Sequence, residues 1–204
     1  MALVTLTALV GSGSGAVSAF DGNARACADR AFGTPAGSWL GADGPADTVG
    51  SALLGAGMLT VLCVLLRHRR PGAATWVLVG LTVQFAAETA LGALVGRPMP
   101  PPADGTLPAP GYSFPSGHMA SATLILMVLL VVLRARTPVW WLCLGLGSTL
   151  VAAVGVSRVL ADAHHASDVV GGVLLGLVVG FAVAFAVARR VDARSLDISG
   201  KEAR

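Results

Sequence analysis

Three short clusters of polar residues lie at the borders of apolar segments. They are Gly96-Arg97-Pro98, Phe114-Pro115-Ser116-Gly117-His118, and a run from Ser157-Arg158 through His164 to Asp168. Polar groups at a membrane border are costly unless they meet water or serve a function. The clusters combine guanidinium and hydroxyl groups, which bind phosphate, with imidazole groups, which can transfer it, and with a carboxylate that can orient an imidazole.

The second cluster predicts the start of a helix, because Ser116 and Gly117 precede an apolar run. The unpaired backbone N–H groups of a helix start bind anions, and a glycine lets a phosphate approach the backbone. Arg97 and Arg158 add two guanidinium groups, whose donors match phosphate oxygens. We expect these four residues to bind the substrate.

Two histidines complete the candidate chemistry. His164 and Asp168 are four residues apart, so on a helix they share a face and the carboxylate can orient the imidazole. An oriented neutral imidazole acts as a nucleophile or a base, and His118 supplies a second imidazole that can protonate a leaving oxygen. The set predicts phosphoryl transfer with no metal and no other cofactor, and the chain has no Cys/His spacing typical of a metal site.

The composition decides which kind of protein carries these clusters. Hydrophobic residues make up 54% of the 204 residues and charged residues only 12%, about half the usual share in globular proteins. So few charges cannot cover a soluble surface, so the sequence predicts an integral membrane protein and excludes a cytosolic enzyme. The net charge of +3 is spread along the chain, which argues against a nucleic-acid partner.

Six apolar stretches predict the fold class, an all-α polytopic membrane bundle with about six transmembrane helices, in a single domain over residues 1–204. A span needs about 20 apolar residues, and the last five stretches fit or nearly fit. The six stretches run over Leu3–Phe20, Ala46–Leu66, Ala74–Val95, His118–Leu133, Val139–Val156 and Val169–Ala188.

The first stretch has two interpretations. Gly11-Ser12-Gly13-Ser14-Gly15 interrupts it, and Val17-Ser18-Ala19 resembles the cleavage site of a signal peptide. A signal peptide begins with basic residues, however, and the first basic residue here is Arg25. We therefore interpret residues 1–20 as a membrane helix, followed by a loop that starts at Asp21.

The basic residues predict the orientation, because cytoplasmic loops are enriched in Lys and Arg. Four of the 14 lie on the side of the polar clusters, namely Arg25, Arg30, Arg97 and Arg158. The other ten lie on the opposite side, namely Arg67, Arg69, Arg70, Arg134, Arg136, Arg189, Arg190, Arg194, Lys201 and Arg204. We expect a multi-pass protein of the cell membrane, with the polar clusters facing outward and the C-terminus in the cytoplasm.

The three clusters also resemble a known family. The order RP, PSGH and SR-x5-H-x3-D is similar to the motifs of the type 2 phosphatidic acid phosphatase (PAP2) superfamily of membrane lipid phosphatases. The resemblance covers residues 74–188, and three motifs in the right order on one side of the membrane are a specific signal.

The resemblance implies a role for each matching residue. It makes His164 the nucleophile that forms a phosphohistidine, Asp168 the residue that holds its ring, and His118 the general acid. The phosphoryl oxygens would be held by Arg97, Ser116, the backbone of Gly117, and Arg158. His165 is a rival nucleophile, but the spacing of the third motif selects His164.

One position departs from the family's pattern. A lysine usually begins the first motif, at the position where this chain has Ala90, and the only lysine is Lys201 in the C-terminal tail. Nearby Glu88 has the wrong sign to replace it, and we expect Glu88 to reach water or pair with an arginine. Asp162 and His165 are expected to be solvated loop residues.

Two functions follow from these residues. The first is a metal-independent phosphatase that acts at the outer face on a lipid phosphate or diphosphate, such as an isoprenoid diphosphate, phosphatidylglycerol phosphate, phosphatidic acid or a polyprenyl-phosphosugar. The alternative is a catalytically degenerate protein that binds phosphate-bearing lipids as a transporter or scaffold. The missing lysine favours the alternative, and the intact His/His/Asp set opposes it. The sequence carries no signal for an oligomeric state.

Overall fold

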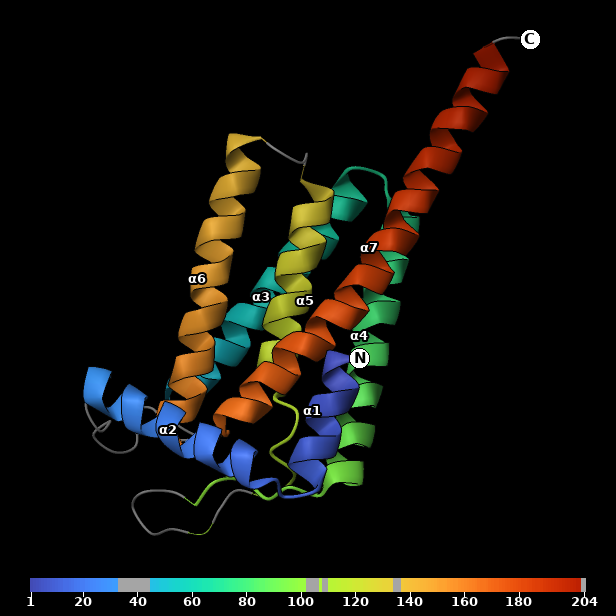
Figure 1. The fold of residues 1–204 in the computed structure, drawn as a ribbon. Helices are drawn as coiled ribbons and strands as arrows, with labels where there is room; N and C mark the ends of the chain where they lie inside the picture. The colour runs from blue at the N-terminus through green and yellow to red at the C-terminus, as the bar shows by residue number, and fades with distance from the viewer. Residues whose placement is uncertain (33–44, 102–106, 108–109, 134–136, 203–204) are drawn as a thin grey trace.

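The computed structural model describes residues 1–32, 45–101, 107, 110–133 and 137–202. The named secondary-structure elements in these residues are all helices (Figure 1). In chain order they are α1 (Ala2–Gly11), α2 (Gly15–Phe32), α3 (Pro45–Arg67), α4 (Pro71–Val95), α5 (Gly117–Val132), α6 (Pro138–Leu160) and α7 (Ala166–Glu202). The predicted all-α class is confirmed.

Four of these helices are long and apolar enough to cross a membrane, and they come from α3, α4, α6 and α7. Helix α5 is apolar but has only 16 residues, which is about 24 Å at 1.5 Å per residue. The described residues therefore hold four full-length candidate spans, or five when the bent pair α1 and α2 is counted as one. The chain is a membrane protein, and its described residues hold these candidate spans together with the shorter apolar α5.

The first apolar stretch is not one continuous helix, so that prediction was wrong in its geometry. The chain bends by 96° between α1 and α2, at the Gly/Ser interruption. Gly13 adopts a positive φ of 64°, which costs a glycine little. In addition, the Ser12 hydroxyl donates to the Leu9 carbonyl, which gives the backbone an alternative to a continuing helix. Helix α2 then runs along one end of the bundle, where a loop from Asp21 was expected (Figure 1).

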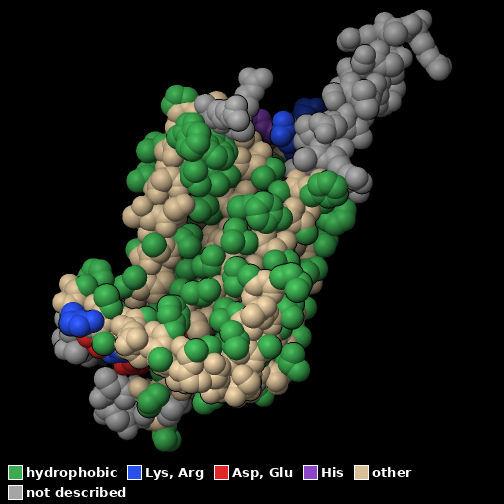
Figure 2. Space-filling model, in the orientation of Figure 1, with side chains coloured by type: hydrophobic (Ala, Val, Ile, Leu, Met, Phe, Trp, Pro, Cys, Tyr) green, Lys and Arg blue, Asp and Glu red, His purple; other side chains and the backbone are tan. Residues whose placement is uncertain are grey.

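The outer surface matches a lipid environment. Figure 2 shows apolar side chains across the middle of one face, with charged side chains at its two ends. Large apolar side chains such as Phe85, Leu146 and Phe181 are more than half exposed. In water such a surface would cause aggregation, whereas in a bilayer it faces acyl chains.

Helix α5 packs most closely against α7, and small residues make this possible. Gly172, Gly176 and Gly180 recur every fourth residue along α7. A Cβ atom at Gly176 would lie 2.5 Å from the Ala120 carbonyl oxygen, and one at Gly180 would lie 2.9 Å from the Met127 Cβ atom. This spacing of small residues lets two membrane helices approach closely, and it places the starts of α5 and α7 together.

The described helix ends that carry the three polar clusters all lie at the same end of the bundle as α2 (Figure 1). Helix α7 continues beyond its expected end at Ala188 and carries the C-terminus away from the end of the bundle where α2 lies (Figure 1). The predicted basic loop residues Arg134 and Arg136, and Arg204, lie outside the described residues.

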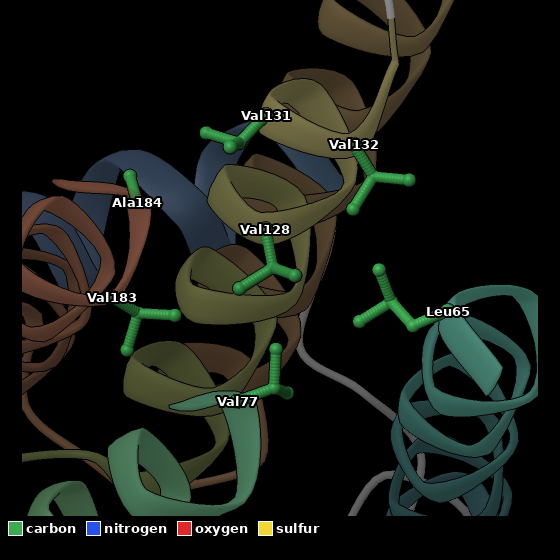
Figure 3. Close-up of a pocket in the computed structure, with 7 residues that line it drawn as sticks. All are labelled: Leu65, Val77, Val128, Val131, Val132, Val183 and Ala184. Carbon is green, nitrogen blue, oxygen red and sulfur yellow. The ribbon is translucent and has the colours of Figure 1, made fainter. Parts of the chain in front are cut away.

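The end of the bundle opposite α2 contains a small internal void. Its lining is entirely aliphatic, with Leu65, Val77, Val128 and Val183 among the residues that surround it (Figure 3). The void has a volume of about 10 Å³, which is about the minimum for one water molecule. It is a packing defect of the core and offers no group for chemistry.

Candidate active site

The three polar clusters converge at one end of the bundle, as their order along alternating helices predicts. The loop after α4 and the loop before α5 are joined by a hydrogen bond from the Ser113 N–H to the Arg97 carbonyl (2.9 Å). The start of α5 is joined to α7 by a bond from the Ser116 N–H to the Asp168 carbonyl (3.0 Å). These two hydrogen bonds connect the three polar clusters, from Arg97 to Asp168, into one site.

The predicted helix start at Ser116 and Gly117 is confirmed, since α5 begins at Gly117 with Ser116 as its N-cap. The Ser116 side chain does not cap the helix. Its Oγ atom, like that of Ser113, is fully buried and has no hydrogen-bond partner among the described residues. Buried hydroxyl groups are normally paired, so the two serine hydroxyls are exceptions among the described residues.

Gly117 lies directly against the Glu88 side chain of α4. A Cβ atom added at Gly117 would collide with the Glu88 carboxylate. The sequence predicts that this glycine lets a phosphate approach the backbone, and the structure shows that it also leaves room for the Glu88 carboxylate. The close contact between Gly117 and Glu88 thus joins the start of α5 to α4.

The His164 imidazole is oriented by a backbone carbonyl. Its Nδ1 atom lies 2.8 Å from the Ser113 oxygen. A carbonyl only accepts hydrogen bonds, so Nδ1 must carry the proton. In the neutral ring the lone pair is therefore on Nε2, which is the form that can attack an electrophile.

Burial lowers the pKa of His164 below the ordinary value for histidine, because a buried imidazolium loses its hydration. The negative charge of Asp168 and the hydrogen bond to Ser113 raise this pKa, whereas the charges of His118 and Arg158 lower it, and the net shift is downward. His164 is therefore neutral and nucleophilic over a wider range of acidic pH than an unperturbed histidine.

The predicted pairing of Asp168 with the His164 ring was wrong. One Asp168 oxygen accepts the His165 backbone N–H at 2.9 Å and lies 3.1 Å from His165 Nδ1. The prediction needed a helix through both residues, but α7 begins at Ala166, so His164 stands outside it. Asp168 is the third residue of α7 and reaches back to cap its first turn.

Arg97 is held by acidic and hydroxyl groups in this structure. Its Nη1 atom donates to Asp168 at 2.8 Å and to the Ser167 hydroxyl at 2.6 Å, and its Nη2 atom donates to Asp21 at 2.6 Å. Asp21 belongs to α2 and is 7% exposed. Arg97 thus lies in the site as expected, but it is linked to residues that the sequence did not single out.

Arg158 and His118 complete the predicted set. Arg158 is buried at the end of α6, and its backbone carbonyl accepts the His164 N–H at 3.2 Å. His118 lies in the first turn of α5, and its Nε2 atom is 2.9 Å from the Ser51 hydroxyl of α3. Ala90, at the position of the family's lysine, is exposed on α4.

An apolar groove of about 520 Å³ adjoins the polar site. It begins beside the motif residues, at Met119, Val159 and Ala166, and reaches Ser148 on α6, roughly 16 Å further along the helix. It is lined by Phe20, Ala24, Ala28, Met119, Thr123, Leu126, Ser148, Val151, Ala152, Gly155, Val156, Val159, Ala166, Val169, Val170, Val173 and Leu177. Such a groove suits a hydrocarbon chain.

Sequence reasoning missed several residues of the site. Asp21 stood in an expected loop, and His165 and Asp162 were expected in solvent, yet His165 contacts Asp168 and Asp162 pairs with Arg25 of α2. The periodicity of Val17, Phe20, Ala24 and Ala28 is a helix signal that could have identified α2. Among the described residues, no group of three or more His, Cys, Asp or Glu side chains is arranged to hold a metal ion.

Comparisons with known proteins concern the family and the fold. The sequence model of the PAP2 superfamily matches residues 73–192. The fold is similar to the crystal structure of the first transmembrane PAP2 type phosphatidylglycerolphosphate phosphatase from Bacillus subtilis, with a TM-score of 0.65, 21% sequence identity, and coverage of 89% of this chain and 92% of that chain. No curated protein sequence matches the chain.

Proposed function

Because the chain belongs to the PAP2 superfamily, we propose that it is a membrane phosphatase that releases phosphate from a lipid phosphate or diphosphate. The observation that carries the proposal is the orientation of His164, whose protonated Nδ1 is held by the Ser113 carbonyl. That contact leaves Nε2 as a free nucleophile among the family's phosphate-binding residues.

The proposed reaction has two steps. In the first, His164 Nε2 attacks phosphorus, a P–N bond forms, the P–O bond to the leaving group breaks, and His118 gives its proton to the leaving oxygen. In the second, His118 takes a proton from water, the water oxygen attacks phosphorus, and the P–N bond breaks to release phosphate. Metal ions have no assigned part in either step.

Donors from four places would hold the phosphoryl oxygens. They are the unpartnered Ser116 hydroxyl, the backbone at Gly117, and the guanidinium groups of Arg97 and Arg158. The buried position of Ser116 and Arg158 supports this role, since hydrogen bonds to a charged oxygen are stronger away from water. Asp168 acts by holding Arg97 and the start of α7.

The groove supports a lipid as the substrate. Its apolar lining adjoins the residues that would hold the phosphate, so a hydrocarbon tail can lie along α6 while the headgroup reaches His164. The structural neighbour is a phosphatidylglycerolphosphate phosphatase, which supports testing phosphatidylglycerol phosphate beside isoprenoid diphosphates, phosphatidic acid and polyprenyl-phosphosugars. The distribution of Lys and Arg supports an outward-facing site in the cell membrane and a cytoplasmic C-terminus.

The test is phosphate release by the purified protein in detergent with EDTA, across that panel of substrates. We expect His164→Ala to lose at least roughly three orders of magnitude in kcat, and His165→Ala to stay within about tenfold of the wild type. Full activity of a folded His164→Ala variant would overturn the mechanism. No release from any substrate by the folded wild type would instead favour the degenerate lipid-binding protein.

A further inference from the structure

Helix α2 lies outside the segment that matches the family, yet it contributes a buried acidic residue to the site. Asp21 is 7% exposed and uses both of its oxygens. Oδ2 accepts from Arg97 Nη2 at 2.6 Å and from the Ser167 hydroxyl at 2.9 Å, and Oδ1 accepts the Ser167 backbone N–H at 2.8 Å. A buried carboxylate with three donors is specified in position and charge.

A second contact of α2 lies one turn along the same face. Arg25 donates to the Val159 carbonyl at 3.0 Å and pairs with the Asp162 carboxylate. Val159 and Asp162 precede His164 in the chain, and Ser167 follows it. Helix α2 is therefore attached to the chain on both sides of His164.

We infer that Asp21 is a positioning residue of the phosphatase site, acting through Arg97 and through the start of α7. This inference rests on the proposed function. Asp21 binds one terminal nitrogen of the Arg97 guanidinium and Asp168 binds the other, which fixes the plane of the group. A fixed plane aims the remaining donors of Arg97 at one place, and a phosphoryl group in the transition state benefits from donors that need no reorganisation.

The loss of charge and the loss of position at Asp21 predict different effects of Asp21→Asn on kcat and KM, which makes the inference testable. The substitution removes one negative charge beside a site that binds an anion, so charge alone would lower KM and leave kcat unchanged. Loss of the fixed Arg97 plane would lower kcat, because a misaimed donor weakens the transition state more than the bound substrate. A purely structural role would lower the melting temperature and the amount of folded protein, while KM and the kcat of each folded molecule would stay the same.

The experiment measures kcat, KM and melting temperature in detergent, with a lipid phosphate that the wild type hydrolyses. For Asp21→Asn we expect kcat to fall at least about tenfold while KM rises less than about twofold. The matched control is Asp29→Asn, because Asp29 also lies on α2 and its contact is with Arg25 on the same helix. We expect this control to keep kcat within about twofold.

A double substitution tests the route of the effect. In an Arg97→Lys background, which lacks the two-nitrogen fork, Asp21→Asn should lower kcat by less than about threefold, because residues that act through one another are not additive. An equal loss in both backgrounds, or unchanged kcat in Asp21→Asn, would overturn the inference.

If Asp21→Asn does not fold, Ser167→Ala replaces it as the test. This change removes the hydroxyl that contacts both Asp21 and Arg97 without a change in charge, and we expect kcat to fall about threefold. An unchanged kcat in that variant would also overturn the inference. A wild-type protein that releases no phosphate would instead contradict the proposed function, so the two failures are distinct.

Discussion

His164 takes its orientation from the backbone of Ser113, across a hydrogen bond of 2.8 Å, and not from the carboxylate of Asp168. Where a carboxylate orients a catalytic histidine, removing it changes the tautomer and lowers kcat by roughly four orders of magnitude. A backbone carbonyl stays in place whatever side chain is changed. The tautomer of His164 should therefore survive substitution of the nearby acid.

We expect Asp168→Asn to lower kcat by less than about 100-fold. The asparagine can still accept one hydrogen bond from Arg97 or from the His165 N–H, while the Ser113 contact remains. Steady-state phosphate release in detergent measures the effect. A loss as large as that of His164→Ala would show that Asp168 orients the nucleophile after all.

The lowered pKa of His164 predicts an extended acid limb in the pH dependence of kcat/KM. The nucleophile is active when neutral, so activity falls as pH drops through the His164 pKa, which burial places below the ordinary histidine value. Asp168 raises this pKa, so Asp168→Asn should move the acid limb to still lower pH. A limb that moves to higher pH would contradict the assignment of the limb to His164.

The contact between Gly117 and Glu88 predicts a coupled pair of substitutions. The methyl group of Gly117→Ala would enter the space of the Glu88 carboxylate, so we expect the variant to lose about 1–3 kcal/mol of stability. Adding Glu88→Ala should recover most of that loss, because the obstacle is removed. Thermal unfolding in detergent compares the two single variants with the double one, and strictly additive losses would argue against the contact.

The groove predicts selectivity for a long apolar tail. Ala152 lines the groove and its neighbour Ala153 does not, so Ala152→Phe should narrow it while Ala153→Phe places the ring elsewhere on α6. For a long-chain substrate we expect Ala152→Phe to raise KM at least about fivefold, with a smaller effect on a short-chain phosphate. Equal KM values for the two variants on the long-chain substrate would contradict the tail site.

Much of this fold could be predicted from the sequence, because a membrane span is read from its length and apolarity alone. The starts of α3, α4, α5, α6 and α7 lie within three residues of the apolar stretches that predicted them. The start of α5 at Gly117 was predicted from the Ser-Gly pair that precedes an apolar run. The same pair also predicted where a phosphate would bind.

The rest depended on contacts that no local pattern records. Helix α2 has a polar sequence after Phe20 and was interpreted as a loop, but its face toward the bundle is held by Arg97 and by Ser167, which is 146 positions from Asp21. The histidine that contacts Asp168 depended on where α7 begins. Because α7 begins at Ala166, this histidine is His165 and not His164. Errors of one or two residues in a helix boundary thus become errors in chemistry.

The contact between Asp21 and Ser167 also has a consequence for biosynthesis. Asp21 lies on α2 and Ser167 lies at the start of α7, so α3, α4, α5 and α6 are synthesised between the two partners. The partners of Arg97 are thus brought together only when α7 enters the membrane. A nascent chain that still lacks α7 holds neither Ser167 nor Asp168, so Arg97 has only one of its three partners until α7 has been made.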